Sequence, residues 1–238
     1  MDKNLKWSEY DFGQIPFDDI EHFGTRSMLD RDTFTVSWLL GRFCNYRCSY
    51  CWPYARSDKK DHRPLEATIG TINEIKRQAR ERGFNSFHFS LSGGEPTFHP
   101  QYLDIVQHLN NDVPNCNFHS LHMTSNVSRP IQWFEKYYQA SKDMHRVSIT
   151  ASYHREHVNT KKKIIEFADK LEFCQEHNIQ ITINIVMVPE FFEQFYEEAL
   201  YFHSRDINVT LKPQSDPTAS FVVDGYTDDQ LARLHKRK

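Results

Sequence analysis

Apolar positions along this chain follow two periods in turn, which predicts strands and helices in regular alternation. Short runs rich in Val, Ile, Phe and Thr fit buried strands, and each is followed by a segment with apolar residues three or four positions apart. The predicted strands cover residues 33–41, 84–96 (ending in a glycine turn), 118–126, 145–154, 179–189 and 207–215. The predicted helices cover residues 64–83, 101–111, 131–141, 160–178, 190–206 and 227–238.

This alternation is typical of a parallel sheet whose strands are joined by right-handed helical crossovers. We therefore expect an α/β fold with parallel strands. In such sheets functional groups gather at the carboxyl ends of the strands. A cysteine loop follows the first predicted strand, Gly-Gly-Glu-Pro follows the second, and polar segments follow the others. The sequence thus predicts one site along one rim of the sheet.

Composition limits the function classes without naming one. Of 238 residues, 39% are hydrophobic and 26% are charged, and the formal net charge is -3. This balance fits a globular core and gives no general attraction for nucleic acid or an anionic membrane. The first residues contain no apolar run that fits a secretory signal, and no segment approaches the ~20 apolar residues that cross a bilayer. We expect a cytoplasmic protein.

The same pattern predicts how the chain is divided. We expect an N-terminal extension at residues 1–34, a core domain at 35–215 and a C-terminal helix or extension at 216–238.

Three of the five cysteines lie in one short loop, in the segment FCNYRCSYCWP at residues 43–53. Cys44, Cys48 and Cys51 have the spacing C-x3-C-x2-C. In a reducing compartment such a cluster indicates a metal site rather than disulfides. Thiolates are ligands for iron–sulfur clusters, zinc and Cu(I).

Zinc is the main alternative to an iron–sulfur cluster. A structural zinc site takes four ligands, whereas Cys116 and Cys174 are isolated in the sequence and fit buried packing positions. His62 is a single candidate for a fourth zinc ligand. A cluster of four irons held by three thiolates leaves one iron open to a small molecule, which gives the missing fourth cysteine a functional meaning.

The two motifs together resemble the radical SAM superfamily: C-x3-C-x-aromatic-C after the first strand, and GGEP at residues 93–96 after the second. The resemblance covers roughly residues 35–215 and implies a partial (β/α)6, TIM-like barrel. It also implies that Cys44, Cys48 and Cys51 ligate one [4Fe–4S] cluster and that Tyr50 packs beside it.

The resemblance implies a set of contacts to S-adenosylmethionine. Gly93, Gly94 and Glu95 match the segment that receives its amino group, and glycines allow a close backbone approach to a ligand. Val188 matches the adenine-contacting stretch by position. Polar groups that end the third and fourth strands are the implied contacts to the ribose and carboxylate, here Thr124, Ser125, Asn126, Ser148, Thr150 and Ser152. Alternation places the last three on one strand face, where ordinary strand hydroxyls are the alternative interpretation.

The activity implied by the resemblance is reductive cleavage of S-adenosylmethionine. The 5′-deoxyadenosyl radical so formed abstracts a hydrogen atom from a substrate, while the protein binds, orients and shields the reacting groups. The implied partners are a small-molecule or peptide substrate and an electron donor such as flavodoxin or ferredoxin. Because no cysteine follows Cys174, we expect one cluster in this chain.

Three further segments are candidates for substrate contact. The loop at residues 52–64 carries four cations that favour an anionic substrate, unless they are a solvated charge run: Arg56, Lys59, Lys60 and Arg63. The turn at residues 153–157 holds two His and one Glu, which also fit a metal set or a solvated turn. Lys212 and Gln214 alternate on the sixth strand and are candidate substrate or cofactor contacts.

Two other functional classes remain open. One is an activase that installs a glycyl radical in a partner enzyme. The other is a non-catalytic iron–sulfur or zinc protein, against which the GGEP motif argues.

Overall fold

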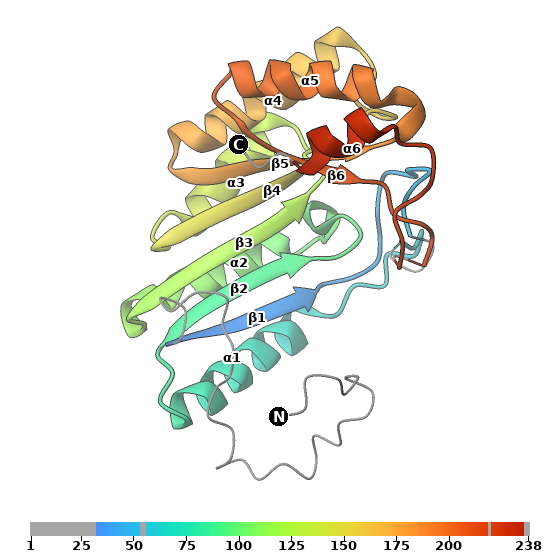
Figure 1. The fold of residues 1–238 in the computed structure, drawn as a ribbon. Coiled ribbons are helices and arrows are strands. Elements are labelled where there is room, and N and C mark those ends of the chain that lie inside the picture. The colour runs from blue at the N-terminus through green and yellow to red at the C-terminus, as the bar shows by residue number, and fades with distance from the viewer. Residues whose placement is uncertain (1–31, 53–55, 219, 236–238) are drawn as a thin grey trace. The chain divides into compact units, whose positions relative to one another are not determined.

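The computed structural model describes residues 32–52, 56–218 and 220–235 (Figure 1). Contacts divide the chain between Asp32 and Thr33, and the fold below is that of the second unit. The predicted N-terminal extension lies outside the described residues as far as residue 31, and so do residues 219 and 236–238 of the predicted C-terminal extension.

Six parallel strands form one sheet in the order β1-β2-β3-β4-β5-β6, as the sequence predicted. Their bounds are β1 Thr33–Leu39, β2 Ser86–Ser92, β3 Phe118–Ser125, β4 Arg146–Tyr153, β5 Ile179–Met187 and β6 Asn208–Pro213. Within the described chain β1 and β6 are the two edges and do not pair with each other, so the sheet is an open, partial barrel. The predicted fold class is confirmed.

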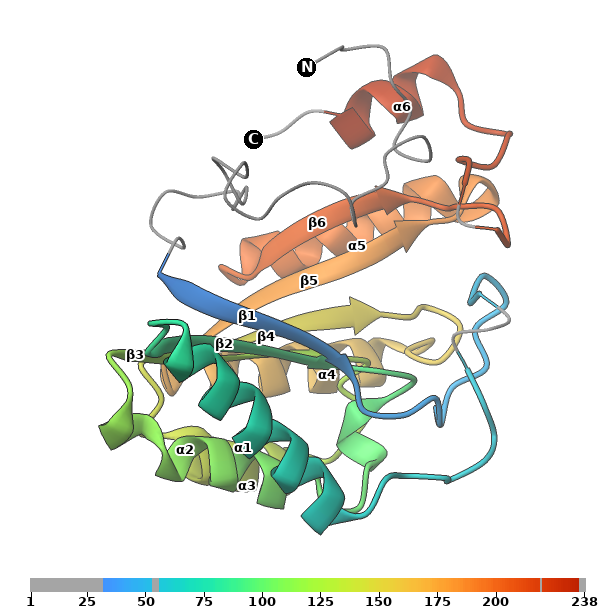
Figure 2. The same cartoon turned by 90° about the horizontal axis from the view of Figure 1, so that it is seen from below.

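Helices join the strands as predicted, and five of them pack along the outer side of the curved sheet (Figures 1 and 2). Their bounds are α1 Leu65–Glu81, α2 Tyr102–Asn111, α3 Ile131–Ser141, α4 Lys161–Glu176, α5 Phe192–Ser204 and, after β6, α6 Asp228–His235. Among the described residues, three short 3-10 turns were not predicted: η5 Pro96–Phe98, η6 Val113–Asn115 and η7 Pro189–Phe191. Each contains a proline near its start and is too short to produce a periodic signal. None of the described helices is long and apolar enough to cross a membrane.

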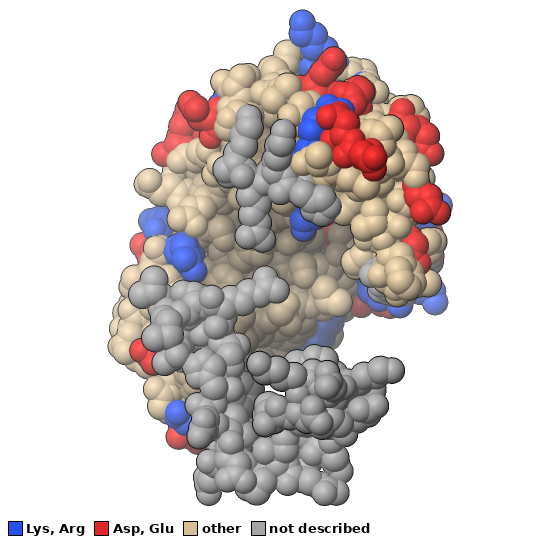
Figure 3. All heavy atoms as spheres, viewed as in Figure 1, with Lys and Arg blue, Asp and Glu red and all other residues tan. Residues whose placement is uncertain are grey.

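Alternation along each strand gives the sheet two different faces. On β5, Ile181, Ile183 and Ile185 are buried against the helices, while the residues between them point to the other side and are partly exposed. We call that other side the inner face. Leu39, Phe118 and Val186 are its only apolar strand positions, and no strand places an Asp or Glu there. In Figure 3 the hollow in this face is largely tan, with acidic and basic side chains at its margins.

The hydrophobic core lies between the outer face of the sheet and the helices. Phe202 of α5 is fully buried, with its ring centroid 5.0 Å from that of Tyr153 on β4 and 5.7 Å from that of Phe167 on α4. These aromatic contacts fix the distance between α4, α5 and the sheet.

Replacing Phe202 by Ala should lower the free energy of unfolding by about 3–5 kcal/mol, because it leaves a cavity among three elements. Leu200 on the same helix is 48% exposed, and Leu200→Ala should change stability by about 0.5 kcal/mol or less. Urea denaturation followed by circular dichroism measures both. Equal effects of the two substitutions would contradict this packing.

Candidate functional site

The cysteine loop begins directly after β1 and is closed by its own backbone. Ser57 donates its N–H to the carbonyl oxygen of Arg42 at 2.7 Å, and Cys44 donates its N–H to the carbonyl oxygen of Ser57 at 3.3 Å. Inside the loop, the N–H of Cys51 donates to the carbonyl oxygen of Cys48 at 3.1 Å, which forms a tight turn. The three predicted metal ligands therefore lie on one closed loop at the carboxyl end of the first strand.

The three thiols are partly buried and are not in disulfides. Burial raises the pKa of Cys44 and of Cys51, and it raises the pKa of Cys48 to about 12, with Glu156 and the other two thiols adding to the rise. Such thiols carry protons until a metal ion displaces them. The donor set is three soft sulfurs, which fits an iron–sulfur cluster with three protein ligands.

The remaining cysteines and His62 do not complete a zinc set in the described chain. Cys174 is buried within α4, and Cys116 donates to the carbonyl oxygen of Asp112 at 3.2 Å, beside α2. His62 packs against the ring of His99 at 4.6 Å between centroids. No group of three metal-binding side chains in the described residues includes any of these.

The GGEP turn pairs through its backbone with the start of the cysteine loop. Gly94 donates its N–H to the carbonyl oxygen of Gly41 at 3.0 Å, and Glu95 donates its N–H to that of Phe43 at 2.7 Å. A Cβ at Gly94 would lie 2.3 Å from the carbonyl oxygen of Phe43, and one at Gly93 would lie 2.4 Å from that of Gly41. Gly93 also has φ +153°. The two glycines are therefore required by the contact between the two motifs.

Glu95 links this turn to the end of β3. Its side chain is buried, and its carboxylate accepts from the N–H and hydroxyl of Thr97 at 3.1 and 2.7 Å. It also accepts from the hydroxyl of Ser125 at 2.8 Å and from the N–H of Asn126 at 2.6 Å. Burial raises the pKa of Glu95, and these donors oppose that rise. The carboxylate of Glu95 is thus occupied by donors from the protein itself.

The segment after β3 connects the same loops a second time. The amide group of Asn126 donates to the side-chain oxygen of Asn45 in the cysteine loop at 2.9 Å. The next residue, Val127, is buried and has φ 54°, a left-handed conformation that costs a β-branched residue roughly 1–2 kcal/mol. Lys170 of α4 donates to the carbonyl oxygen of Val127 at 2.5 Å, which helps to hold this turn in place. Strained backbone of this kind is concentrated at functional sites.

The predicted contacts at the strand ends divide between the two faces of the sheet. Thr124 and Thr150 are paired in register on the inner face, and Ser148 and Ser152 lie on the same face of β4. Ser125 points to the opposite face, where its hydroxyl meets Glu95. The sequence contains this information, because successive side chains of a strand alternate between its two faces and neighbours in Thr-Ser-Asn therefore cannot share one. Val188 follows β5 and is half-buried.

The basic loop after the cysteines is partly neutralised by its own carboxylate. Asp58 pairs with Arg56 at 3.4 Å and with Arg47 at 3.0 Å. Lys60 lies over the ring of Phe43, 5.1 Å from its centroid. Residues 53–55 of this predicted substrate loop lie outside the described residues.

The turn after β4 lies against the cysteine loop, which the sequence did not predict. Glu156 accepts from the N–H of Ser49 at 2.9 Å, and Tyr50 bonds through its hydroxyl to Nδ1 of His154 at 2.9 Å. Burial raises the pKa of Tyr50 and lowers the pKa of His154 to about 4, so this pair is neutral near pH 7. The contact joins loops more than a hundred residues apart and has no periodic signal in the sequence.

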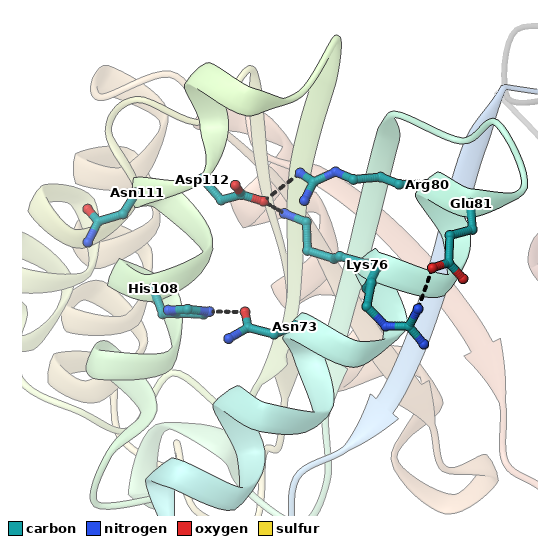
Figure 4. Close-up of a pocket in the computed structure, with 8 residues that line it drawn as sticks. Asn73, Lys76, Arg80, Glu81, His108, Asn111 and Asp112 are labelled. Atoms are coloured by element: carbon teal, nitrogen blue, oxygen red, sulfur yellow. Dashed lines mark hydrogen bonds and ion pairs between the residues drawn. The ribbon is translucent and has the colours of Figure 1, made fainter.

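A pocket of about 680 Å³ lies elsewhere, between α1 and α2 (Figure 4). Its polar side chains bind one another: Lys76 and Arg80 both pair with Asp112, and His108 bonds with Asn73 at 2.8 Å. The charges in this pocket are therefore matched internally, on the outer side of the sheet and away from the cysteine loop.

Replacing Gly94 by Ala should disrupt the pairing of the two motifs and reduce the iron bound per chain after anaerobic reconstitution. The cause is the clash of the new Cβ with two carbonyl oxygens. Gly70 on α1 has open space around its Cα, so Gly70→Ala should retain the iron and gain about 0.5–1 kcal/mol of stability. Iron analysis and urea denaturation measure both. Full iron content in the Gly94 variant would contradict the proposed role of the turn.

Solved structures share the fold of this chain at low sequence identity. Native anSMEcpe with bound AdoMet is 16% identical, with a TM-score of 0.57, and the match covers 78% of this chain and 53% of that chain. The same protein with bound AdoMet and the Kp18Cys peptide is 14% identical, with a TM-score of 0.60, and the match covers 85% and 57%. The chain thus spans about half the length of these proteins. At this identity the likeness shows the fold, a partial TIM-like barrel.

No curated protein sequence matches the chain at a significant level. The family model of the radical SAM superfamily matches residues 38–201, which is more than half of the chain and includes both the cysteine loop and the GGEP turn. The chain belongs to the radical SAM superfamily.

Proposed function

We propose that this radical SAM enzyme holds one [4Fe–4S] cluster through Cys44, Cys48 and Cys51 and cleaves S-adenosylmethionine there. When bound, the two cofactors supply a 5′-deoxyadenosyl radical, which abstracts a hydrogen atom from the substrate. The observation that carries this proposal is the backbone pairing of the cysteine loop with the GGEP turn. It brings the residues proposed to hold iron next to the residues proposed to hold the ligand of the open iron.

The proposed S-adenosylmethionine site follows the rim from that pairing. Gly93, Gly94 and the backbone of Glu95 would receive the amino group. The hydroxyls of Thr124 and Thr150 face the inner side of the sheet beside one another and are the best-placed of the predicted ribose and carboxylate contacts. Val188 at the end of β5 remains the proposed adenine contact. The hydroxyl of Ser125 and the carboxylate of Glu95 bond to each other, so we propose that they support the site without contacting S-adenosylmethionine.

The substrate proposed for the inner face is polar and either neutral or anionic. The inner face carries hydroxyl, amide and imidazole groups, with Arg146 at the start of β4, Lys212 near the end of β6 and no carboxylate on any strand. A cationic substrate would find no opposite charge on these strands, whereas hydroxyl, amide and carboxylate groups would find donors. Both a small molecule and a peptide satisfy this requirement, and the peptide bound to anSMEcpe favours testing peptides first.

The cellular setting proposed here follows from the chemistry. Reduced thiols and a low-potential electron donor such as flavodoxin or ferredoxin are available in the cytoplasm, where we place the enzyme. The core that carries out the reaction is proposed to be residues 35–215, flanked by the two extensions.

Anaerobic reconstitution should give brown protein with about four irons per chain, and the reduced protein should form 5′-deoxyadenosine slowly without substrate. Cys44→Ala, Cys48→Ala and Cys51→Ala should each abolish both signals, because two thiolates do not retain the cluster. Cys116→Ser should leave both unchanged. Iron analysis and chromatography of the nucleoside products measure these outcomes, and a deuterated substrate should transfer its label. Stoichiometric zinc without iron uptake would refute the proposal.

Glu95→Gln should weaken S-adenosylmethionine binding by roughly 10–100-fold, because an amide N–H₂ would face the donors of Thr97, Ser125 and Asn126. We expect the cluster to remain. Glu135 is exposed on α3, and Glu135→Gln should bind S-adenosylmethionine normally. Anaerobic equilibrium dialysis on iron-loaded protein measures the affinity. Unchanged affinity in the Glu95 variant would exclude this coupling between the buried carboxylate and the ligand site.

A further inference from the structure

The turn after β4 makes its closest polar contact with the residue that follows Cys48. Both carboxylate oxygens of Glu156 accept from the backbone N–H of Ser49, at 3.2 and 2.9 Å, and the Ser49 hydroxyl also donates to this carboxylate. Ligand atoms of Cys48, Glu156 and His157 lie within 4.8 Å of one another. The carboxylate therefore lies beside one of the three proposed iron ligands.

Neighbouring residues of the turn contact the rest of the loop between the first and last cysteines. The ring of His157 is stacked on that of Tyr46, with centroids 3.9 Å apart and planes at 7°. Nε2 of His157 accepts from the N–H of Arg47 at 3.3 Å. Lys163 of α4 donates to the carbonyl oxygen of His157 at 3.0 Å, which anchors the turn to a helix. The turn is thus a fixed support for the loop.

These contacts distinguish support from direct metal binding. Both oxygens of Glu156 are occupied by donors of Ser49, and Nε2 of His157 is occupied by a backbone N–H. Ligation of a metal by either side chain would break the bonds that fix the loop. The turn also contributes a negative charge, because no Lys or Arg forms an ion pair with Glu156 in the described part of the chain.

We infer that Glu156 is a positioning residue for the cysteine loop and that its carboxylate makes the cluster harder to reduce. The inference rests on the proposed function, specifically on a cluster at Cys44, Cys48 and Cys51. Reduction adds one negative charge to the cluster, and a fixed anion beside Cys48 opposes that charge. The hydrogen bonds to Ser49 orient the loop, while the charge sets the midpoint potential, so the two effects are separable by mutation.

Three variants of the full chain separate the charge from the support. Glu156→Gln keeps the size of the side chain, removes its charge and leaves one amide oxygen to accept from the N–H of Ser49, whose hydroxyl can turn to accept from the new amide N–H₂. Glu156→Asp keeps the charge and shortens the reach to Ser49, and Glu135→Gln is the control on α3. Each is reconstituted anaerobically, iron is counted, and the midpoint potential is measured by redox titration followed by electron paramagnetic resonance. Iron release to a chelator reports how firmly the loop holds the cluster.

We expect Glu156→Gln to shift the midpoint potential to a less negative value at unchanged iron content. Glu156→Asp should keep a potential near that of the wild type and release iron several-fold faster to the chelator. Glu135→Gln should match the wild type in both measurements. A wild-type protein that takes up no iron would contradict the proposed function itself. A loaded Glu156→Gln variant with an unchanged or more negative potential would overturn the charge effect, and wild-type iron retention in Glu156→Asp would overturn the support.

Discussion

The site depends on one short stretch of main-chain pairing, in which the N–H groups of Gly94 and Glu95 bond to the carbonyl oxygens of Gly41 and Phe43. Two segments from successive strand ends approach each other so closely that a single Cβ at Gly94 would overlap two carbonyl oxygens. Because the contact is made by backbone, it requires little of the sequence beyond the glycines. The cysteine loop begins at the same residues, so these backbone bonds alone fix where it starts.

The surrounding side chains convert that pairing into a rigid rim. Glu95 takes donors from the segment after β3, and Asn126 reaches from the same segment to Asn45 in the cysteine loop. The cysteine loop is thereby held by the segments that follow β2 and β3. The turn after β4 adds a third contact, through Ser49. A loop held this way loses less conformational freedom when a metal binds, which favours binding even though burial opposes ionisation of the thiols.

The sequence alone predicted the strands and helices, because the spacing of apolar residues changes between a strand-like and a helix-like period wherever one element gives way to the next. The helix at residues 131–141 was predicted with the bounds that the structure gives to α3. The sequence named Ser125 and Thr124 together as contacts at the end of the third strand, whereas alternation places their side chains on opposite faces. The contact of Ser49 with Glu156 lay beyond prediction, because two irregular loops meet there and neither carries a periodic pattern. Local rules therefore recover the elements and the rim, while contacts between loops require the tertiary structure.

Carboxylates are absent from the inner face of the strands but are present around the cysteine loop. The inner-face positions of the six strands hold hydroxyl, amide and imidazole groups, Arg146, Lys212 and three apolar side chains but no acid, so a ligand there would meet directional hydrogen bonds without a fixed negative charge. The carboxylates in and around the cysteine loop do not lie on the strands: Glu95 is part of the GGEP turn, Glu156 is on the turn after β4, and Asp58 pairs with Arg47 and Arg56. Within a medium of low dielectric, such placement matters, because a charge acts strongly on its near neighbours. The carboxylate of Glu156 thus lies beside Cys48 without a Lys or Arg partner among the described residues, whereas Asp58 is paired with two arginines, and no carboxylate lies on the strand face proposed to meet the substrate.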